Sequence, residues 1–260
     1  MNMQESLTKI AWEAGEILLS ADRPEVLITK PGNANFVTEY DLRVQRFLEE
    51  RLSALLPEAT FIGEEDTETH TPGRLCWIVD PIDGTTNFLH GMKSSAISIA
   101  LCEGGETQAG LVLQPYLREL YYAEFGRGAT CNGDPIRVSN RPVEEALVHF
   151  GTAPYHREHA PHTFGLLQDL FATVADLRRT GSAAIDLISV ASGRADGFFE
   201  PSLAPWDFGA GKLILTEAGG KISDMKGAPL PLFSSASLLC GNPAVYDWLL
   251  ENVLKHDLPY

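Results

Sequence analysis

Two aspartates lie three positions apart in the segment Trp77–Phe88, whose sequence is WIVDPIDGTTNF. Residues 75–79 form a short apolar run with β-branched members, which predicts a buried strand that ends at Asp80. The proline that follows fixes one φ angle and Gly84 permits a tight turn, so Asp83 can fold back toward the pocket that Asp80 faces. Clustered carboxylates repel each other, and Mg²⁺ relieves that repulsion because it prefers oxygen ligands. The segment therefore predicts a site that holds metal ions against a phosphate.

The residues after the second aspartate are suited to hold the phosphate itself. The backbone amides of Gly84, Thr85 and Thr86 are sterically open, and they become good anion donors if a helix begins there. On this pattern alone, a capped turn between two strands is an equally good interpretation.

Two further segments place acids where a strand ends or a helix begins. Phe61–Asp66, with the sequence FIGEED, predicts a second strand that ends in acidic residues. Asp207 follows Pro205 and Trp206 at the expected start of an apolar helix. Three separate acidic positions of this kind favour one shared site over three unrelated turns.

These motifs, together with WDFGAG at 206–211 and TEAGG at 216–220, resemble those of the inositol monophosphatase family. The resemblance covers nearly the whole chain, and the motifs occur in the family's order. It implies a mixed α/β fold layered as an αβαβα sugar-phosphatase sandwich. It also implies Mg²⁺-dependent hydrolysis of a small phosphomonoester, lithium sensitivity and a homodimer.

Position by position, the resemblance assigns these residues to a site for two or three Mg²⁺ ions. Glu64, Asp80 and the Ile82 carbonyl match the ligands of one ion. Asp80, Asp83 and Asp207 match the ligands of a second, and Glu64 would also contact a weaker third. This agrees with the independent logic of a two-metal clamp, in which both the attacking and the leaving oxygen are stabilised.

The same resemblance assigns the catalytic and substrate-binding roles. Thr85, backed by Asp41, would position the attacking water together with Glu64, while the amides of Gly84 and Thr85 would hold the phosphate. For Glu200 the alternative interpretation is an exposed acid after a strand at Phe198–Phe199. The positions that match substrate contacts are Asp83, Ala183, Glu200 and Asp207.

Two departures from the family pattern limit what can be transferred. Asn35 stands where the family often has an aspartate, and Met92–Ser94 replaces a common aromatic-proline-aromatic run. Lys30 matches a loop lysine near the site in relatives, although a solvated loop lysine is an equally good interpretation.

Composition sets wider bounds on the fold and the partners. The 260-residue chain is 44% apolar, so it can bury a large core, either as one domain or as two joined halves at 1–144 and 145–260. Its formal net charge is −15, which argues against nucleic-acid binding because phosphate backbones would be repelled. The amphipathic N-terminus does not read as a signal peptide, and no apolar run approaches a membrane span. We therefore expect a soluble, cytoplasmic enzyme.

Cysteine and histidine spacings offer two other chemistries. Cys131 and Arg137 have the C-x5-R spacing of cysteine phosphatases, but Asp134 and Pro135 occupy what should be a small phosphate-cradling loop. The four cysteines, at 76, 102, 131 and 240, are expected to be mostly buried free thiols in a reducing compartment. Histidines at 156, 159 and 162 suggest a metal site, but a solvated loop leading into a helix is the favoured interpretation.

The coarse element pattern is consistent with a mixed fold. It predicts a helix at 4–20 and a second helix opened by a capping box at Thr38–Asp41. Residues 95–138 are expected to form mostly antiparallel strands. Beyond 145, strands should alternate with helices at 162–177, 182–193, 207–218 and 243–255.

Other functions compete with that of an inositol-phosphate phosphatase. A haloacid-dehalogenase phosphatase needs D-x-D, whereas Asp80 and Asp83 have two residues between them. Within the resembling superfamily, Thr86–Phe88 favours inositol monophosphates over fructose 1,6-bisphosphate, histidinol phosphate or nucleotide 3′-phosphates. A regulatory, protein-binding member of the same fold is the alternative outside enzymology, and the complete acidic set favours catalysis.

Overall fold

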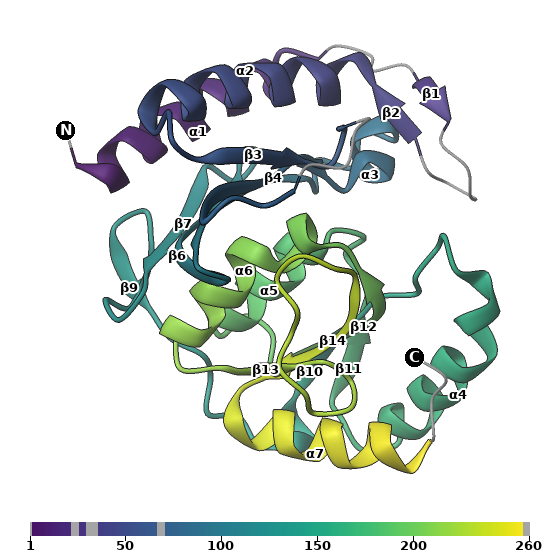
Figure 1. The fold of residues 1–260 in the computed structure, drawn as a ribbon. Helices are drawn as coiled ribbons and strands as arrows, with labels where there is room; N and C mark the ends of the chain where they lie inside the picture. The colour runs from purple at the N-terminus through teal and green to yellow at the C-terminus, as the bar shows by residue number, and fades with distance from the viewer. Residues whose placement is uncertain (1, 22–25, 30–35, 67–70, 257–260) are drawn as a thin grey trace.

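Figure 1 shows five layers in the computed structural model, in the order helices, sheet, helices, sheet, helices. The layering confirms the expected αβαβα arrangement. The division of the chain into two halves, 1–144 and 145–260, stays a prediction. The structure describes residues 2–21, 26–29, 36–66 and 71–256, so Lys30 and Asn35 lie outside the described residues.

The outer N-terminal layer consists of α1 (Met3–Leu19) and α2 (Glu39–Leu55). Each begins with a capping box, in which a side chain satisfies amides that the first helical turn leaves unpaired. Thr38 is the cap of α2, as the sequence predicts, and Asp41 completes its box. Because this box fixes the first turn of α2, it also fixes the position of the Asp41 carboxylate. Ahead of α2, β1 (Val26–Thr29) and β2 (Phe36–Thr38) form a small antiparallel pair.

The larger sheet follows chain order through seven strands. Its first two strands are parallel, and all other pairs are antiparallel, which confirms the predicted meander over 95–138. The strands are β3 (Thr60–Gly63), β4 (Leu75–Asp83), β5 (Ala96–Glu103), β6 (Glu106–Gln114), β7 (Glu119–Glu124), β8 (Ala129–Cys131) and β9 (Asp134–Ile136).

Between the sheets lie α5 (Ala183–Ala191) and α6 (Pro205–Glu217). The close packing of α6 against β6 depends on Gly110, because a Cβ there would lie 2.7 Å from the Ala210 carbonyl oxygen of α6. Aliphatic and aromatic side chains from both helices and both sheets form one buried cluster. This central layer therefore holds the N-termini of α5 and α6 at fixed positions beside β4.

The second sheet has the strand order β11 (Asp176–Arg178), β10 (Leu147–Phe150), β12 (Gly197–Leu203), β14 (Ala236–Gly241) and β13 (Lys221–Ser223). Strand β10 runs parallel to both of its neighbours, and the other two pairs are antiparallel. On its outer face lie α4 (Ala160–Phe171) and α7 (Pro243–Lys255). Two short 3₁₀ turns, Val143–Glu145 and Arg157–His159, precede β10 and α4.

Two expected boundaries are wrong. The helix expected over 162–177 ends at Phe171, because residues 176–178 pair in parallel with β10 and Ala175 donates its N–H to the Ala146 carbonyl. The strand expected to end near Asp80 continues to Asp83, with a register irregularity between the two aspartates.

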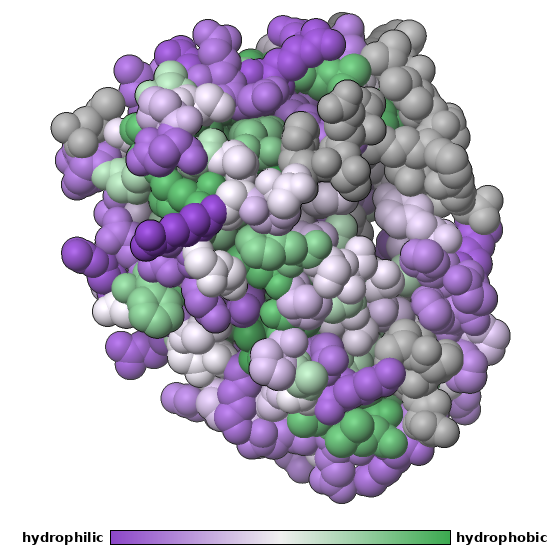
Figure 2. Space-filling model, viewed as in Figure 1, coloured by the Kyte–Doolittle hydropathy of each residue, from purple (hydrophilic) through white to green (hydrophobic). Residues whose placement is uncertain are grey.

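The surface in Figure 2 is mostly polar, with hydrophobic side chains in small separate patches, which fits the net charge of −15. Among the helices of the described residues, none is long and apolar enough to cross a membrane. All four cysteines are free thiols, and all but Cys131 are buried.

Candidate active site

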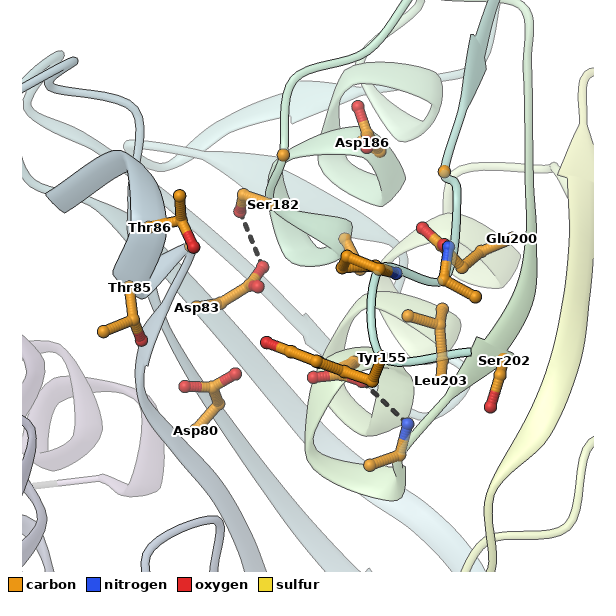
Figure 3. Close-up of a pocket in the computed structure, with 18 of the residues that line it drawn as sticks. Asp80, Asp83, Thr85, Thr86, Tyr155, Ser182, Asp186, Glu200, Ser202 and Leu203 are labelled. Carbon is orange, nitrogen blue, oxygen red and sulfur yellow. Dashed lines mark hydrogen bonds between the residues drawn. The ribbon is translucent and has the colours of Figure 1, made fainter. Parts of the chain in front are cut away.

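A pocket of about 540 Å³ opens where the end of β4 meets the N-termini of α5 and α6. Figure 3 shows Asp80 and Asp83 on one side of the pocket, and Tyr155 and Glu200 on the other. Of the predicted site residues, all but Asp41 line this pocket, and Asp41 lies directly behind it. Chain segments far apart in sequence thus meet at one cavity.

The irregular end of β4 explains how two aspartates of one strand share a site. Asp80 pairs with Ser98 of β5, and Asp83 pairs with Ala96, so the three-residue step on β4 faces a two-residue step on β5. The Ile82 N–H folds back to donate to Asp80 Oδ1 at 3.0 Å. This turn sets both carboxylates toward the pocket, as the sequence predicts.

The Asp83 carboxylate lies at the N-terminus of α5. Its Oδ2 accepts hydrogen bonds from the Ser182 hydroxyl and the Ala184 N–H, both at 2.6 Å. Burial raises the pKa of Asp83 to about 6, although these hydrogen bonds act in the opposite direction. The hydrogen bond between Ser182 and Asp83 joins the start of α5 to β4 across 99 residues of sequence. The next residue, Ala183, which matches a substrate contact, also lines the pocket.

Asp207 reaches the same point from the first turn of α6. Its Oδ2 accepts the Ala204 N–H at 2.7 Å, which fixes the carboxylate at the helix N-terminus. One carboxylate oxygen each from Asp80, Asp83 and Asp207 lie within 4.8 Å of one another. Glu64 follows β3, its N–H donating to the Val79 carbonyl at 3.1 Å.

The electrostatics of this cluster fit a divalent cation. Burial raises the pKa of Asp80 well above its ordinary value, and the nearby carboxylates, Glu64 first among them, raise it further. The pKa of Asp207 is raised by burial and then by Asp83. The donor set consists of carboxylate oxygens plus the Ile82 carbonyl, which is the chemistry that Mg²⁺ takes. The residues present therefore fit the implied metal.

Thr85 and Asp41 meet at the edge of the cluster. The Thr85 hydroxyl lies 3.2 Å from Asp41 Oδ1 and 3.1 Å from the Ile82 carbonyl oxygen, and it can donate to either. Asp41 is fully buried, and its Oδ2 accepts the Thr38 N–H at 2.7 Å. Burial raises the pKa of Asp41. The two residues are paired as the resemblance implies, while their catalytic roles stay predictions.

Gly84 makes the turn after β4 possible. Its φ of +87° is unfavourable for other residues, and a Cβ would lie 3.1 Å from the Ser94 carbonyl oxygen. The short helix α3 (Thr85–Leu89) begins directly after it. From α3, the Asn87 side chain donates to the carbonyls of Ser94 and Thr180, at 2.7 and 2.9 Å. The unusual run 92–94 therefore supplies this contact through its backbone, which any residue could do.

Glu200 is a buried residue of β12, so the alternative of an exposed acid is wrong. Its Oε1 accepts the Ala153 N–H at 2.6 Å, and a Cβ at Gly151 would lie only 1.3 Å from its Oε2. Burial raises the pKa of Glu200 to about 8. The proposed substrate contact of this side chain stays a prediction.

Sequence reasoning missed several pocket residues, among them Tyr155, Arg179 and Asp186. Asp186 is buried and its Oδ1 lies 2.6 Å from His149 Nδ1. None of them belongs to a recognisable motif, and only the tertiary fold brings them here.

The residues 156–159 form an exposed loop and a 3₁₀ turn leading into α4, which is the interpretation that the sequence favoured. The ligand atoms of His156, Glu158 and His159 nevertheless lie within 4.8 Å of one another.

The cysteine-phosphatase interpretation is not supported by the geometry. Cys131 ends β8 and pairs with Asp134 at the start of β9, across a hairpin turn. The C-x5-R segment therefore runs through a hairpin, and no helix follows Cys131 to present amides to a phosphate.

Comparison with known proteins decides the family. The family model described as the inositol monophosphatase family matches residues 2–258. The chain belongs to the inositol monophosphatase family. It is 41% identical to an inositol-1-monophosphatase of Rhizobium meliloti, over 89% of this chain and 87% of that protein. It is 36% identical to the Nus factor SuhB of Escherichia coli K12, over 94% and 93% of the two chains. A solved IMPase of Thermotoga maritima superposes with a TM-score of 0.88 at 32% identity, covering 98% of each chain. Family membership supports a phosphatase and confirms the resemblance seen in the sequence motifs.

Proposed function

We propose that the chain is a Mg²⁺-dependent phosphomonoesterase that hydrolyses inositol 1-phosphate or a similar small polyol phosphate. The observation that carries the proposal is the convergence of Asp80, Asp83 and Asp207 on one pocket, beside the turn at Gly84. A bound cation would offset the repulsion between these crowded carboxylates. The same cation would attract an anionic phosphate ester, which a chain of net charge −15 otherwise repels.

Mg²⁺ bound there would supply positive charge to the phosphate and would make water a better nucleophile. Glu64, Asp80, Asp83, Asp207 and the Ile82 carbonyl would hold the ions.

The remaining residues orient the substrate and the water. The hydroxyl of Thr85 donates toward Asp41, so its oxygen lone pairs are left to accept a hydrogen bond from the water. The amides at the start of α3 would bind phosphate oxygens. The positions matched to substrate contacts, Asp83, Ala183, Glu200 and Asp207, all line the pocket.

The test is hydrolysis of several phosphomonoesters across a Mg²⁺ titration, followed by exhaustive chelation. Inositol 1-phosphate should be cleaved only with the metal present, lithium should inhibit, and thiol alkylation should leave most activity. Activity that survives chelation but is lost on alkylation would overturn the proposal. Fructose 1,6-bisphosphate, histidinol phosphate and a nucleotide 3′-phosphate belong in the panel, since preference for one of these would replace the proposed substrate.

A second candidate is a regulatory, protein-binding role, favoured by the 36% identity to the E. coli Nus factor SuhB. Binding of the purified chain to a component of the transcription machinery would support it, and an Asp83→Asn variant would show whether binding and hydrolysis separate. The proposal also includes a homodimer in the cytoplasm, which sedimentation and cell fractionation can test.

A further inference from the structure

The loop from Gly151 to His156 lies against the pocket opposite the turn at Gly84. It places Tyr155 in the pocket lining with half of its surface exposed. Figure 3 shows the Tyr155 ring between the acidic cluster and Glu200, with its hydroxyl toward Asp80 and Asp83. A phenol is protonated at neutral pH, so the Tyr155 hydroxyl can donate a hydrogen bond.

The backbone of this loop is held in an unfavourable conformation. Ala153 has a φ of +41°, a left-handed value that residues with a Cβ rarely adopt. Two hydrogen bonds fix the turn around it: Gly151 N–H to the Phe199 carbonyl at 2.8 Å, and His156 N–H to the Ala153 carbonyl at 2.8 Å. A strained turn persists only where its surroundings hold it, and here a buried side chain supplies the third contact.

That side chain is Glu200. Its Oε1 accepts the Ala153 N–H at 2.6 Å, which satisfies the amide of the strained residue. Its other oxygen lies so close to Gly151 that any Cβ there would overlap it. Only 8% of Glu200 is exposed, whereas Tyr155, which also lines the pocket, is 50% exposed.

We propose that Tyr155 is a specificity-determining residue that contacts the non-phosphate end of the substrate, and that Glu200 acts on substrate choice by positioning the 151–156 loop. The chemical class it favours is a ring-bearing phosphomonoester, a cyclitol or sugar phosphate. An aromatic face packs well on the C–H face of such a ring, and the phenol can donate to one of its hydroxyls. This inference rests on the proposed phosphatase function.

The first experiment compares kcat/KM for inositol 1-phosphate with that for the acyclic glycerol 2-phosphate, at saturating Mg²⁺. Tyr155→Ala should lower the value for inositol 1-phosphate on the order of tenfold or more, mainly through KM, and change glycerol 2-phosphate much less. Phe164→Ala removes a similarly exposed ring on α4, outside the residues that line the pocket, and should change neither. Equal losses on both substrates, or none, would overturn the role of Tyr155.

The second experiment separates a positioning role of Glu200 from direct substrate contact. Glu200→Gln keeps a carbonyl to accept the Ala153 N–H, so it should retain the preference for the cyclitol phosphate. Glu200→Ala removes the acceptor and should lose that preference. Glu200→Ala should have little further effect in a protein that already carries Tyr155→Ala, because both substitutions act on substrate choice through Tyr155. Additive losses, or a Glu200→Gln variant as impaired as Glu200→Ala, would show that Glu200 binds the substrate itself.

These outcomes are distinct from failure of the proposed function. If the unmodified protein cleaves neither substrate with Mg²⁺, the phosphatase proposal fails. If it cleaves both and the Tyr155 variants keep the same ratio, only this inference fails. Circular dichroism and thermal melting of each variant show whether it is folded, and Tyr155→Phe gives a milder change that isolates the hydroxyl.

Discussion

Glu200 should make the stability of the metal-free protein depend on pH between neutral and mildly alkaline conditions. The carboxyl group is buried in β12, and burial raises its pKa from 4.5 to about 8. Because the folded-state pKa lies above the unfolded one, protonation favours the folded state. The resulting stabilisation is complete below pH 4.5 and is lost as the pH rises through 8. Glu200→Gln resembles the protonated form in shape and cannot ionise, so it removes this contribution.

The size of the effect follows from the two pKa values. The difference between a folded-state pKa of about 8 and the ordinary value of 4.5 corresponds to roughly 5 kcal/mol between the protonated and the ionised limits. Most of this is expressed in an accessible range. Between pH 6 and pH 9, the free energy of unfolding of the unmodified protein should fall by on the order of 3 kcal/mol relative to that of Glu200→Gln.

The assay is urea denaturation of both proteins in EDTA at pH 6, 7, 8 and 9. The other buried acids, Asp80, Asp83 and Asp207 among them, titrate in both proteins, so the difference between the two curves isolates Glu200. The unmodified protein should be the more strongly destabilised as the pH rises. Parallel curves across the whole range would mean that Glu200 is ionised in the folded state at pH 6, and they would refute the reasoning.

Three further predictions follow from the site and the core. Asp83→Asn keeps an acceptor for Ser182 and Ala184, so it should fold and lose about 4 kcal/mol of barrier lowering, roughly a thousandfold in turnover; activity near that of the unmodified protein would contradict the metal-ligand role. Mg²⁺ should raise the melting temperature more at pH 8 than at pH 5.5, because Asp83, with a pKa of about 6, must lose its proton to bind the ion; an equal or smaller shift at pH 8 would argue against carboxylate ligands. Gly110→Ala should destabilise by roughly 1–3 kcal/mol in chemical denaturation, since its Cβ meets the Ala210 backbone, whereas the control Gly165→Ala on α4 meets nothing within 4 Å and should be neutral or stabilising.

The sequence was most informative where local chemistry and function coincide. The box at Thr38 specified the start of α2, and the segment after Trp77 specified the strand and turn that carry Asp80, Asp83 and Gly84. In each case the residues that position the site are adjacent in sequence to those that form it. Capping residues, prolines and glycines restrict φ and ψ locally, so their effect can be seen without knowing the tertiary fold.

The two wrong boundaries have a different cause. Residues 172–177 are compatible with helix, yet 176–178 pair with β10, a strand 29 positions earlier. Strand pairing depends on which backbone lies alongside, and a helical pattern in a short window does not contain that information. The continuation of β4 to Asp83 likewise depends on the match between Asp83 and Ala96 of β5.

The far part of the pocket depends on contacts of this long-range kind. Ala153 meets Glu200 across 47 residues, and nothing in the local sequence of either indicates the other. Transfer of a family role to Glu200 by position assumes that its carboxylate faces the substrate, whereas the structure turns one oxygen toward the loop amide. The carboxylates around Asp80 lie in segments with recognisable motifs, so the sequence predicts that they share a site. Substrate choice is instead set by whichever loop packs opposite them, and in this chain that loop presents Tyr155 to the pocket.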